Sequence, residues 1–265
     1  MKASVNGIAI NYELSGPEGA PPVVLHHPLA TNLTCWEELT AALAPRYRVL
    51  RLDARGHGKS DAPKGAYTFE TLAKDVVDLM THCGIQRASF LGLSMGGMVG
   101  QYLGLLYPDR FHNLCLVSTS SRIPADAAPI WEQRITNSKA SGMASQVEGA
   151  MQRWVSPRAL KENPALVKRL SATIEATPVD GYIGWCHAIS GLNVTDRLGA
   201  IRLPTRVIVG EIDPATPVAA SQAIHQAIPG SDLVIVPGVS HMLHNEEPEL
   251  FNSHVLSFLD AHAKA

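Results

Sequence analysis

The stretch Phe90-Leu91-Gly92-Leu93-Ser94-Met95-Gly96-Gly97 has the pattern Gly-x-Ser-x-Gly, with Ser94 at its centre. An apolar run precedes the serine, and apolar residues at helical spacing follow it from Met95 to Leu106. A strand, one serine and a helix in this order predict a nucleophile elbow, a turn so tight that its neighbours must be small, as Gly92 and Gly96 are. The helix would direct its free N–H groups at the reacting centre. The stretch therefore predicts Ser94 as a nucleophile.

The composition is that of a globular protein with a sizeable core. The chain has 265 residues, of which 46% are hydrophobic, and a formal net charge of −2 without basic runs. We therefore expect neither nucleic acid nor a membrane as a partner, and without a signal peptide or membrane span we expect a cytoplasmic protein. The four cysteines lie far apart without a C-x-x-C pair, which indicates reduced thiols.

Strand and helix patterns alternate on both sides of the elbow, which predicts right-handed crossovers and a mostly parallel sheet. An Asn-Gly pair at residues 6–7 also predicts an N-terminal hairpin. The strand-like runs beyond it are Val23–Leu25, Tyr47–Leu52, Ala88–Leu93, Leu114–Val117, Arg206–Val209 and Leu233–Val236.

The pattern changes between residues 121 and 202, where prolines separate helical segments and no strand-like run occurs. We predict an α/β core formed by residues 1–120 and 203–265, with residues 121–202 inserted in it as a helical cap. As a group over the site, six cap side chains would line a pocket for an anionic, partly apolar substrate, although each singly is more often a packing or surface residue. They are Trp131, Arg134, Arg153, Trp154, Tyr182 and Trp185, and we take the first four as the candidate substrate contacts.

A serine nucleophile needs a base, and the base needs an acid that fixes its tautomer. In a parallel sheet such groups converge at the carboxyl ends of the strands. Asp213 follows the first of the two late strands, with Glu211 as a weaker candidate, and His241 follows the second, with His244 as a competitor. The order Ser94, Asp213, His241 is that of hydrolases built on an elbow.

The oxyanion of a tetrahedral intermediate needs N–H donors. One is the backbone N–H of Met95, directly after the nucleophile, and the second comes from the loop after an early strand. In that loop Pro28 has no N–H, so the candidate is the N–H of Leu29. The sequence contains no metal-ligand spacing, phosphate loop or dinucleotide fingerprint, so we expect neither a metal nor a cofactor.

These motifs resemble the α/β-hydrolase superfamily over essentially the whole chain, and within it the 3-oxoadipate enol-lactonases. The resemblance implies a mostly parallel central sheet flanked by helices with an inserted helical cap. It also implies a serine hydrolase of a small lactone or carboxylic ester, with Ser94, Asp213 and His241 as its triad. The resemblance rests on Asp53-x-Arg55-Gly56-His57-Gly58-x-Ser60, Gly92 to Gly97, Trp131-Glu132-x-Arg134-Ile135, Arg153-Trp154, Ala176-Thr177-Pro178-x-x-Gly181-Tyr182, Asp213 to Pro217 and His241 with Glu247-Pro248-Glu249.

The chain departs from the lactonase pattern near the predicted site, at His26-His27-Pro28, Ser190–Asn193 and Met242–His244. A broad carboxylesterase and a C–C bond hydrolase of ring-fission products therefore stay open as alternatives with the same triad. A ligand-binding receptor is the alternative of another class. Haloalkane dehalogenases and epoxide hydrolases resemble this fold but place an aspartate where Ser94 stands. The natural substrate and the oligomeric state stay open.

Overall fold

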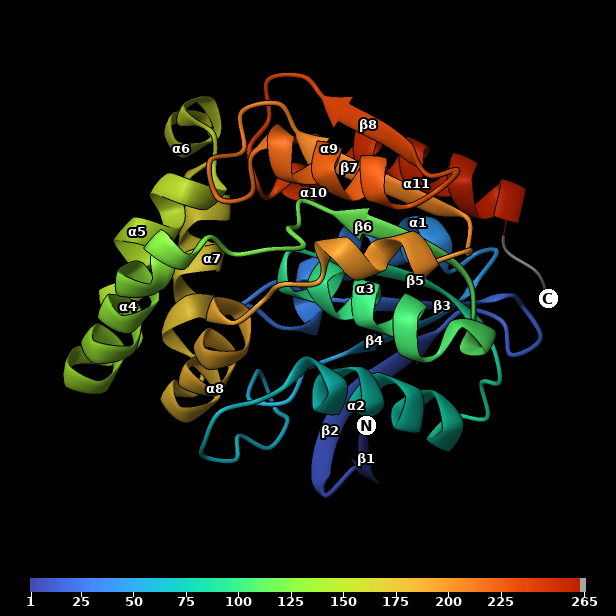
Figure 1. Cartoon of the computed structure of the whole chain (residues 1–265), viewed down its shortest axis with the longest axis horizontal. Coiled ribbons are helices and arrows are strands. Elements are labelled where there is room, and N and C mark those ends of the chain that lie inside the picture. Colours follow the sequence, from blue (N-terminus) through green and yellow to red (C-terminus); the bar gives the residue numbers. More distant parts are fainter. Residues whose placement is uncertain (263–265) are drawn as a thin grey trace.

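The computed structural model describes residues 1–262, and within them eight strands form one sheet in the order β1-β2-β4-β3-β5-β6-β7-β8 (Figure 1). Strands β3 to β8 pair in parallel, whereas β1 and β2 are antiparallel, so the predicted mostly parallel sheet and the N-terminal hairpin are confirmed. The strands are β1 (Lys2–Val5), β2 (Ile8–Ser15), β3 (Pro22–His26), β4 (Arg48–Leu52), β5 (Ala88–Leu93), β6 (Phe111–Val117), β7 (Thr205–Gly210) and β8 (Asp232–Val236).

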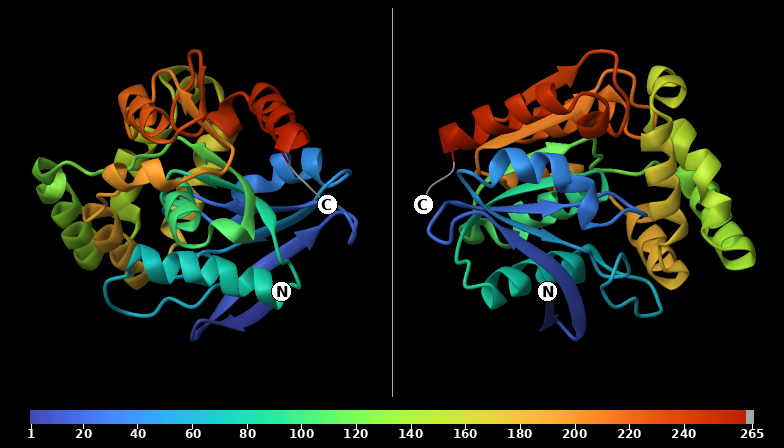
Figure 2. Two further views of the ribbon diagram at one scale, coloured as in Figure 1. Left: turned by 45° about the vertical axis from the view of Figure 1, so that its right-hand side comes forward. Right: turned by 180° about the vertical axis from the view of Figure 1, so that it is seen from behind.

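Helices cover both faces of the sheet, with α2 and α3 on one face and α1 and α11 on the other (Figures 1 and 2). The α-helices are α1 (Glu37–Leu43), α2 (Phe69–His82), α3 (Met95–Leu106), α4 (Ala128–Ser141), α5 (Ala144–Trp154), α6 (Pro157–Glu162), α7 (Pro164–Glu175), α8 (Val179–Ser190), α9 (Val218–Ala227), α10 (Leu243–Glu246) and α11 (Pro248–His262). Short 3-10 turns are η1 (Leu33–Trp36), η2 (Pro108–Arg110), η3 (Ala125–Ala127) and η4 (Thr195–Ala200). None of the described helices is long and apolar enough to cross a membrane.

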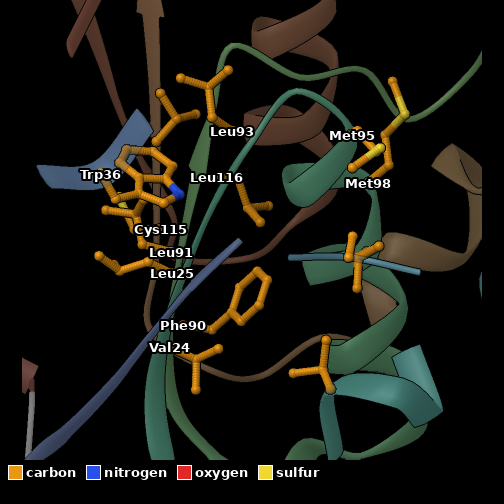
Figure 3. Packing of buried hydrophobic residues seen from close by; sticks show 14 of the residues in the cluster. Val24, Leu25, Trp36, Phe90, Leu91, Leu93, Met95, Met98, Cys115 and Leu116 are labelled. Carbon is orange, nitrogen blue, oxygen red and sulfur yellow. The ribbon is translucent and has the colours of Figure 1, made fainter. Parts of the chain in front are cut away.

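Strand β5 is buried at all six positions because helices pack on both of its faces. Phe90 and Leu91 point to opposite sides of the sheet, and Leu91 lies on the side of Trp36 (Figure 3). Apolar side chains on both faces fix β5 in the middle of the core. The turn that follows β5 is therefore held rigidly.

The five helices α4 to α8 form a helical insert between β6 and β7, at the edge of the sheet where β6 and β8 end (Figure 1). The two segments that connect the insert to the sheet run antiparallel, with a bridge between Arg122 and Asn193 and a hydrogen bond of 2.8 Å from Val194 N–H to Ser121 O. Figure 2 shows the insert beside the sheet from two further sides. This edge, where the carboxyl ends of parallel strands meet a separate helical layer, is where a site is expected.

Candidate active site

Ser94 lies between β5 and α3 with φ 54° and ψ −112°, a conformation that residues other than glycine seldom adopt. Its N–H donates to Val117 O and its carbonyl accepts from the Thr119 hydroxyl, both at 2.8 Å. A Cβ on Gly92 would overlap the backbone carbonyl of Gly96, so this turn requires a glycine there. The structure thus places Ser94 on the strained turn that its sequence predicts.

Asp213 and His241 lie side by side, and both are buried. His241 Nδ1 is 2.8 Å from Asp213 Oδ2, which fixes the proton on Nδ1 and leaves Nε2 as an acceptor. Asp213 Oδ1 also accepts from the N–H groups of Ala215 and Thr216, at 2.8 and 3.0 Å. Burial alone would raise the pKa of the Asp213 carboxyl, but His241 and Thr216 outweigh it and hold this pKa below its ordinary value.

The two weaker candidates lie elsewhere. The Glu211 carboxylate accepts a hydrogen bond of 2.9 Å from Gly238 N–H on the exposed surface. The His244 ring packs 4.9 Å from the Trp36 ring, and neither of its nitrogens has a close hydrogen-bond partner among residues 1–262. Burial, with Arg169 and His241 nearby, lowers the His244 pKa to about 3, so the ring is neutral. Of the four residues, the structure brings only Asp213 and His241 together.

Neither of the two predicted oxyanion donors, Leu29 N–H and Met95 N–H, donates to an acceptor within residues 1–262. The loop carrying Leu29 is held by its neighbour Ala30, which takes φ 55° and donates its N–H to His57 Nε2 at 2.9 Å. Burial and the nearby His27 lower the His57 pKa well below 6.5, so this nitrogen stays free to accept. Sequence analysis missed this contact, because His57 and Ala30 are far apart along the chain.

A cavity of about 400 Å³ connects these groups. Ser94, His241 and Leu29 line it from the core, and the helical insert forms the opposite wall. The insert residues in that wall include all four predicted substrate contacts, Trp131, Arg134, Arg153 and Trp154, together with Gln146 and Tyr182. The structure therefore brings the predicted residues of both segments to one cavity, apart from Met95 and Asp213, which do not line it; Met95 directly follows Ser94, and Asp213 bonds to His241.

Two arginines in this cavity have no carboxylate partner within the described part of the chain, and no acidic residue lines the cavity. The Arg134 guanidinium lies 4.4 Å from the centre of the Trp131 ring, a cation–π contact. Arg153 has no such contact, and burial together with the charge of Arg134 lowers its pKa to about 10. Arg153 therefore stays cationic at neutral pH, and because no acidic residue lines the cavity, the two guanidinium groups give it an excess of positive charge.

The insert is also bonded to the loop that carries His241. The Trp154 ring stacks on the His241 ring with centroids 6.5 Å apart, and the N–H that follows His241 donates to Trp154 O at 2.9 Å. Glu246 Oε1 accepts from Ser156 N–H at 3.0 Å and from Ser240 N–H at 3.3 Å. No sequence pattern points to Glu246 as a functional residue, because it belongs to no motif that would indicate this role.

The fold and these groups define a class of protein. A family model for the alpha/beta hydrolase fold matches residues 21–248. The chain belongs to this family, and the prediction of its fold is confirmed.

The proteins that this chain is similar to include lactonases and esterases. The 3-oxoadipate enol-lactonase 2 of Acinetobacter baylyi is 33% identical over 245 residues, which cover 92% of this chain and 91% of that protein. The structure of the enol-lactonase from Burkholderia xenovorans LB400 has a TM-score of 0.95 at 34% identity and covers 98% of this chain and 100% of its own. An esterase from Thermogutta terrifontis has a TM-score of 0.93 at 26% identity and covers 98% of both chains.

Proposed function

We propose that this chain is a serine hydrolase that cleaves a small lactone or carboxylic ester through an acyl-enzyme, with an enol-lactone similar to that of 3-oxoadipate as its substrate. One observation carries the proposal. Ser94, the Asp213–His241 pair and two unpaired arginines belong to one site, in a chain that is similar to two enol-lactonases over nearly its full length. Residues 121–202 act in it as the cap that sets the choice of substrate.

In the proposed reaction Ser94 Oγ attacks the acyl carbon while His241 Nε2 takes its proton. The negative charge that develops on the carbonyl oxygen is stabilised by the N–H groups of Leu29 and Met95, which have no other acceptor in the described part of the chain. The tetrahedral intermediate collapses, the ring C–O bond breaks, and His241 returns the proton to the leaving group. Water, activated by the same histidine, then hydrolyses the acyl-enzyme. Asp213 stabilises the imidazolium that forms in both steps.

The arginines account for the preference for an anionic substrate. An enol-lactone of this type carries a carboxylate, which loses its hydration on entering the cavity and needs cationic partners there. Arg134 and Arg153 are such partners, and the Trp131 and Trp154 rings supply apolar surface for the rest of the substrate. A carboxylate between the arginines would offset the charge that lowers the pKa of Arg153.

Covalent labelling tests the nucleophile. A fluorophosphonate is expected to add once, on the peptide that contains Ser94, and Ser94→Ala is expected to abolish both labelling and turnover while the circular dichroism spectrum stays unchanged. Labelling of another residue in active protein would contradict the mechanism.

Paired substrates test the arginines. Arg153→Ala or Arg134→Ala is expected to lower kcat/KM for 3-oxoadipate enol-lactone. The loss corresponds to about 2–5 kcal/mol of activation free energy, as when one partner of a buried charge pair is truncated. The kcat/KM for a neutral acetate ester should stay nearly unchanged. Arg122→Ala is the control, because Arg122 lines the same cavity but already pairs with Asp196 at 2.8 Å. Equal losses on both substrates would make the arginines structural and favour a broad carboxylesterase.

A further inference from the structure

A second hollow lies on the outside of the helical insert, between α4 and α5. It has a volume of about 410 Å³ and is lined only by residues of these two helices. We call it the outer groove. Figure 1 shows α4 and α5 at the edge of the molecule, on the side of the insert away from the sheet. Four residues line both the outer groove and the inner cavity: Ile130, Arg134, Gln146 and Arg153. The wall between the two spaces is therefore built around two cations.

The outer groove has an excess of positive charge. Its other polar lining groups are amides and a hydroxyl, including Gln133 and Asn137, and none of its lining residues is acidic. Neither arginine has an ion-pair partner among residues 1–262. Gln146, by contrast, is fixed in the wall, since its amide bonds to Arg134 O and accepts from the Tyr182 hydroxyl, both at 3.2 Å. A groove with donors, two cations and no anion is complementary to a carboxylate.

Gly149 shows where the Arg153 guanidinium lies. A Cβ at this position would come within 2.9 Å of Arg153 Nη1, so the guanidinium covers the bare backbone of Gly149 one turn earlier on α5. Gly149 lines the outer groove and not the inner cavity. A glycine inside a helix costs about 0.5–1 kcal/mol relative to alanine, and here it leaves room for the arginine head. The long side chain of Arg153, which has no hydrogen bond or ion pair to any residue in 1–262, thus faces both spaces.

We propose that the outer groove is a carboxylate-binding antechamber, from which Arg153 transfers an anionic ligand to the inner cavity. The ligand class is a small mono- or dicarboxylate. The claim that the bound carboxylate belongs to the substrate or product of the hydrolase rests on the proposed function. The claim that the groove binds a carboxylate does not. The groove itself follows from the shared arginines and from Gly149.

The test changes the charge of the groove without touching the inner cavity. Gln133 lines only the groove, so Gln133→Glu and Gln133→Lys add one charge of either sign to it. The probe is adipate, and its association rate constant is followed by the tryptophan fluorescence of the full chain in a stopped-flow instrument. We expect the association rate constant to fall in the order Lys, Gln, Glu at position 133, by about threefold for each unit of charge at low salt. The three rate constants should converge near 1 M salt, where the screening length is about 3 Å.

The control series places the same charges at Gln152, an exposed position of α5 that lines neither space. Any one of three results would overturn the proposal. They are equal association rates across the Gln133 series, the same order of rates in the Gln152 series, and no binding of adipate by the unaltered chain. Gly149→Ala is the second variant. It is expected to weaken adipate binding about tenfold by displacing the guanidinium, with thermal stability kept or raised, because alanine favours the helix.

The two proposals fail separately. A chain that hydrolyses the lactone but shows no charge order keeps the proposed function and loses the antechamber. A chain that shows the order but is not labelled at Ser94 keeps the antechamber and loses the hydrolase mechanism.

Discussion

The hydroxyl of Thr216 touches both members of the buried acid–base pair. It donates to Asp213 Oδ2 at 2.8 Å and lies 3.3 Å from His241 Nδ1. The same oxygen of Asp213 therefore receives two hydrogen bonds, which divide its negative charge between the hydroxyl and the imidazole. We infer that Thr216 is a positioning residue, which fixes the carboxylate plane so that the histidine keeps its tautomer.

Thr216→Val is expected to keep the shape of the side chain and remove this donor. Asp213 retains its two backbone N–H donors, so we expect the protein to fold and kcat to fall about tenfold, the effect of one charge-assisted hydrogen bond of roughly 1.5 kcal/mol. The acidic limb of the pH–rate profile should move to higher pH. Thr216→Ser restores the hydroxyl and should restore both readouts, and a valine variant with the full rate would make the contact incidental.

At the scale of elements, helix α5 and the loop that carries His241 form one unit. The helix ends at Trp154, whose carbonyl and ring both contact this loop, and the chain then passes to Ser156, whose N–H is bound by Glu246. A displacement of the insert therefore displaces the imidazole. The position of the insert and the competence of the predicted base are coupled through Glu246.

Glu246→Gln tests this coupling with almost no change in volume. The two N–H groups then lose a charged acceptor, which costs about 1–3 kcal/mol in the free energy of unfolding. Because Ser240 precedes His241 directly, we also expect a fall in kcat toward a neutral ester. Glu247→Gln is the matched control, since it breaks only an ion pair with Arg158 on the exposed surface, where water screens the two charges. Equal denaturation midpoints and rates for the two variants would contradict the coupling.

At the scale of the whole molecule, buried neutral histidines join the loops that follow neighbouring strands. His27, after β3, accepts the N–H of Ala54, after β4, and His57 accepts that of Ala30, both at 2.9 Å. Burial lowers the pKa of His26 to about 3, with a further contribution from His27, and the pKa of His27 to about 4. The edge of the sheet beneath the cavity thus depends on rings that carry no charge.

Acid should therefore destabilise the fold before its carboxylates titrate. In the unfolded chain these histidines bind protons near pH 6.5, whereas the folded chain excludes them down to about pH 4. The unfolded state holds more protons across this window, so the free energy of unfolding falls as the pH falls, by up to about 1.4 kcal/mol per pH unit for each ring. Urea unfolding at pH 7, 6 and 5 measures this slope, and a slope of zero would refute the argument.

His244→Phe provides the comparison. It removes one buried ring whose pKa lies below that of the unfolded chain, and neither ring nitrogen has a partner at hydrogen-bond distance and angle among residues 1–262, although the Cys35 backbone is close enough to oppose the fall in its pKa. We expect stability at pH 7 within about 1 kcal/mol of the unaltered chain, because one aromatic ring replaces another beside Trp36. Below pH 6.5 the free energy of unfolding should fall less steeply with falling pH, because one proton fewer is taken up on unfolding. A severe loss of stability at pH 7 would mean that a ring nitrogen is required.

The features that the sequence predicted correctly are those that short stretches determine. Asn6 and Gly7 form the turn between β1 and β2, because an Asn-Gly pair readily takes the positive φ angles, 47° and 79°, that this turn needs. The glycines around Ser94 permit one turn, and alternating strands and helices permit few sheets. The order of Ser94, Asp213 and His241 then follows from strand ends that meet at one edge, although their roles stay predictions until labelling and mutation test them.

The sequence by itself determined the fold class, the elbow and the candidate acid, base and oxyanion donors, because local backbone preferences and side-chain periodicity act over a few residues. Only the tertiary structure decided which groups meet across long separations. It set His57 on the N–H of Ala30, Glu246 on Ser156, and the guanidinium of Arg153 between two spaces, above the bare backbone of Gly149. Such contacts depend on how the helical insert packs against the sheet, and no periodicity in the chain records that packing.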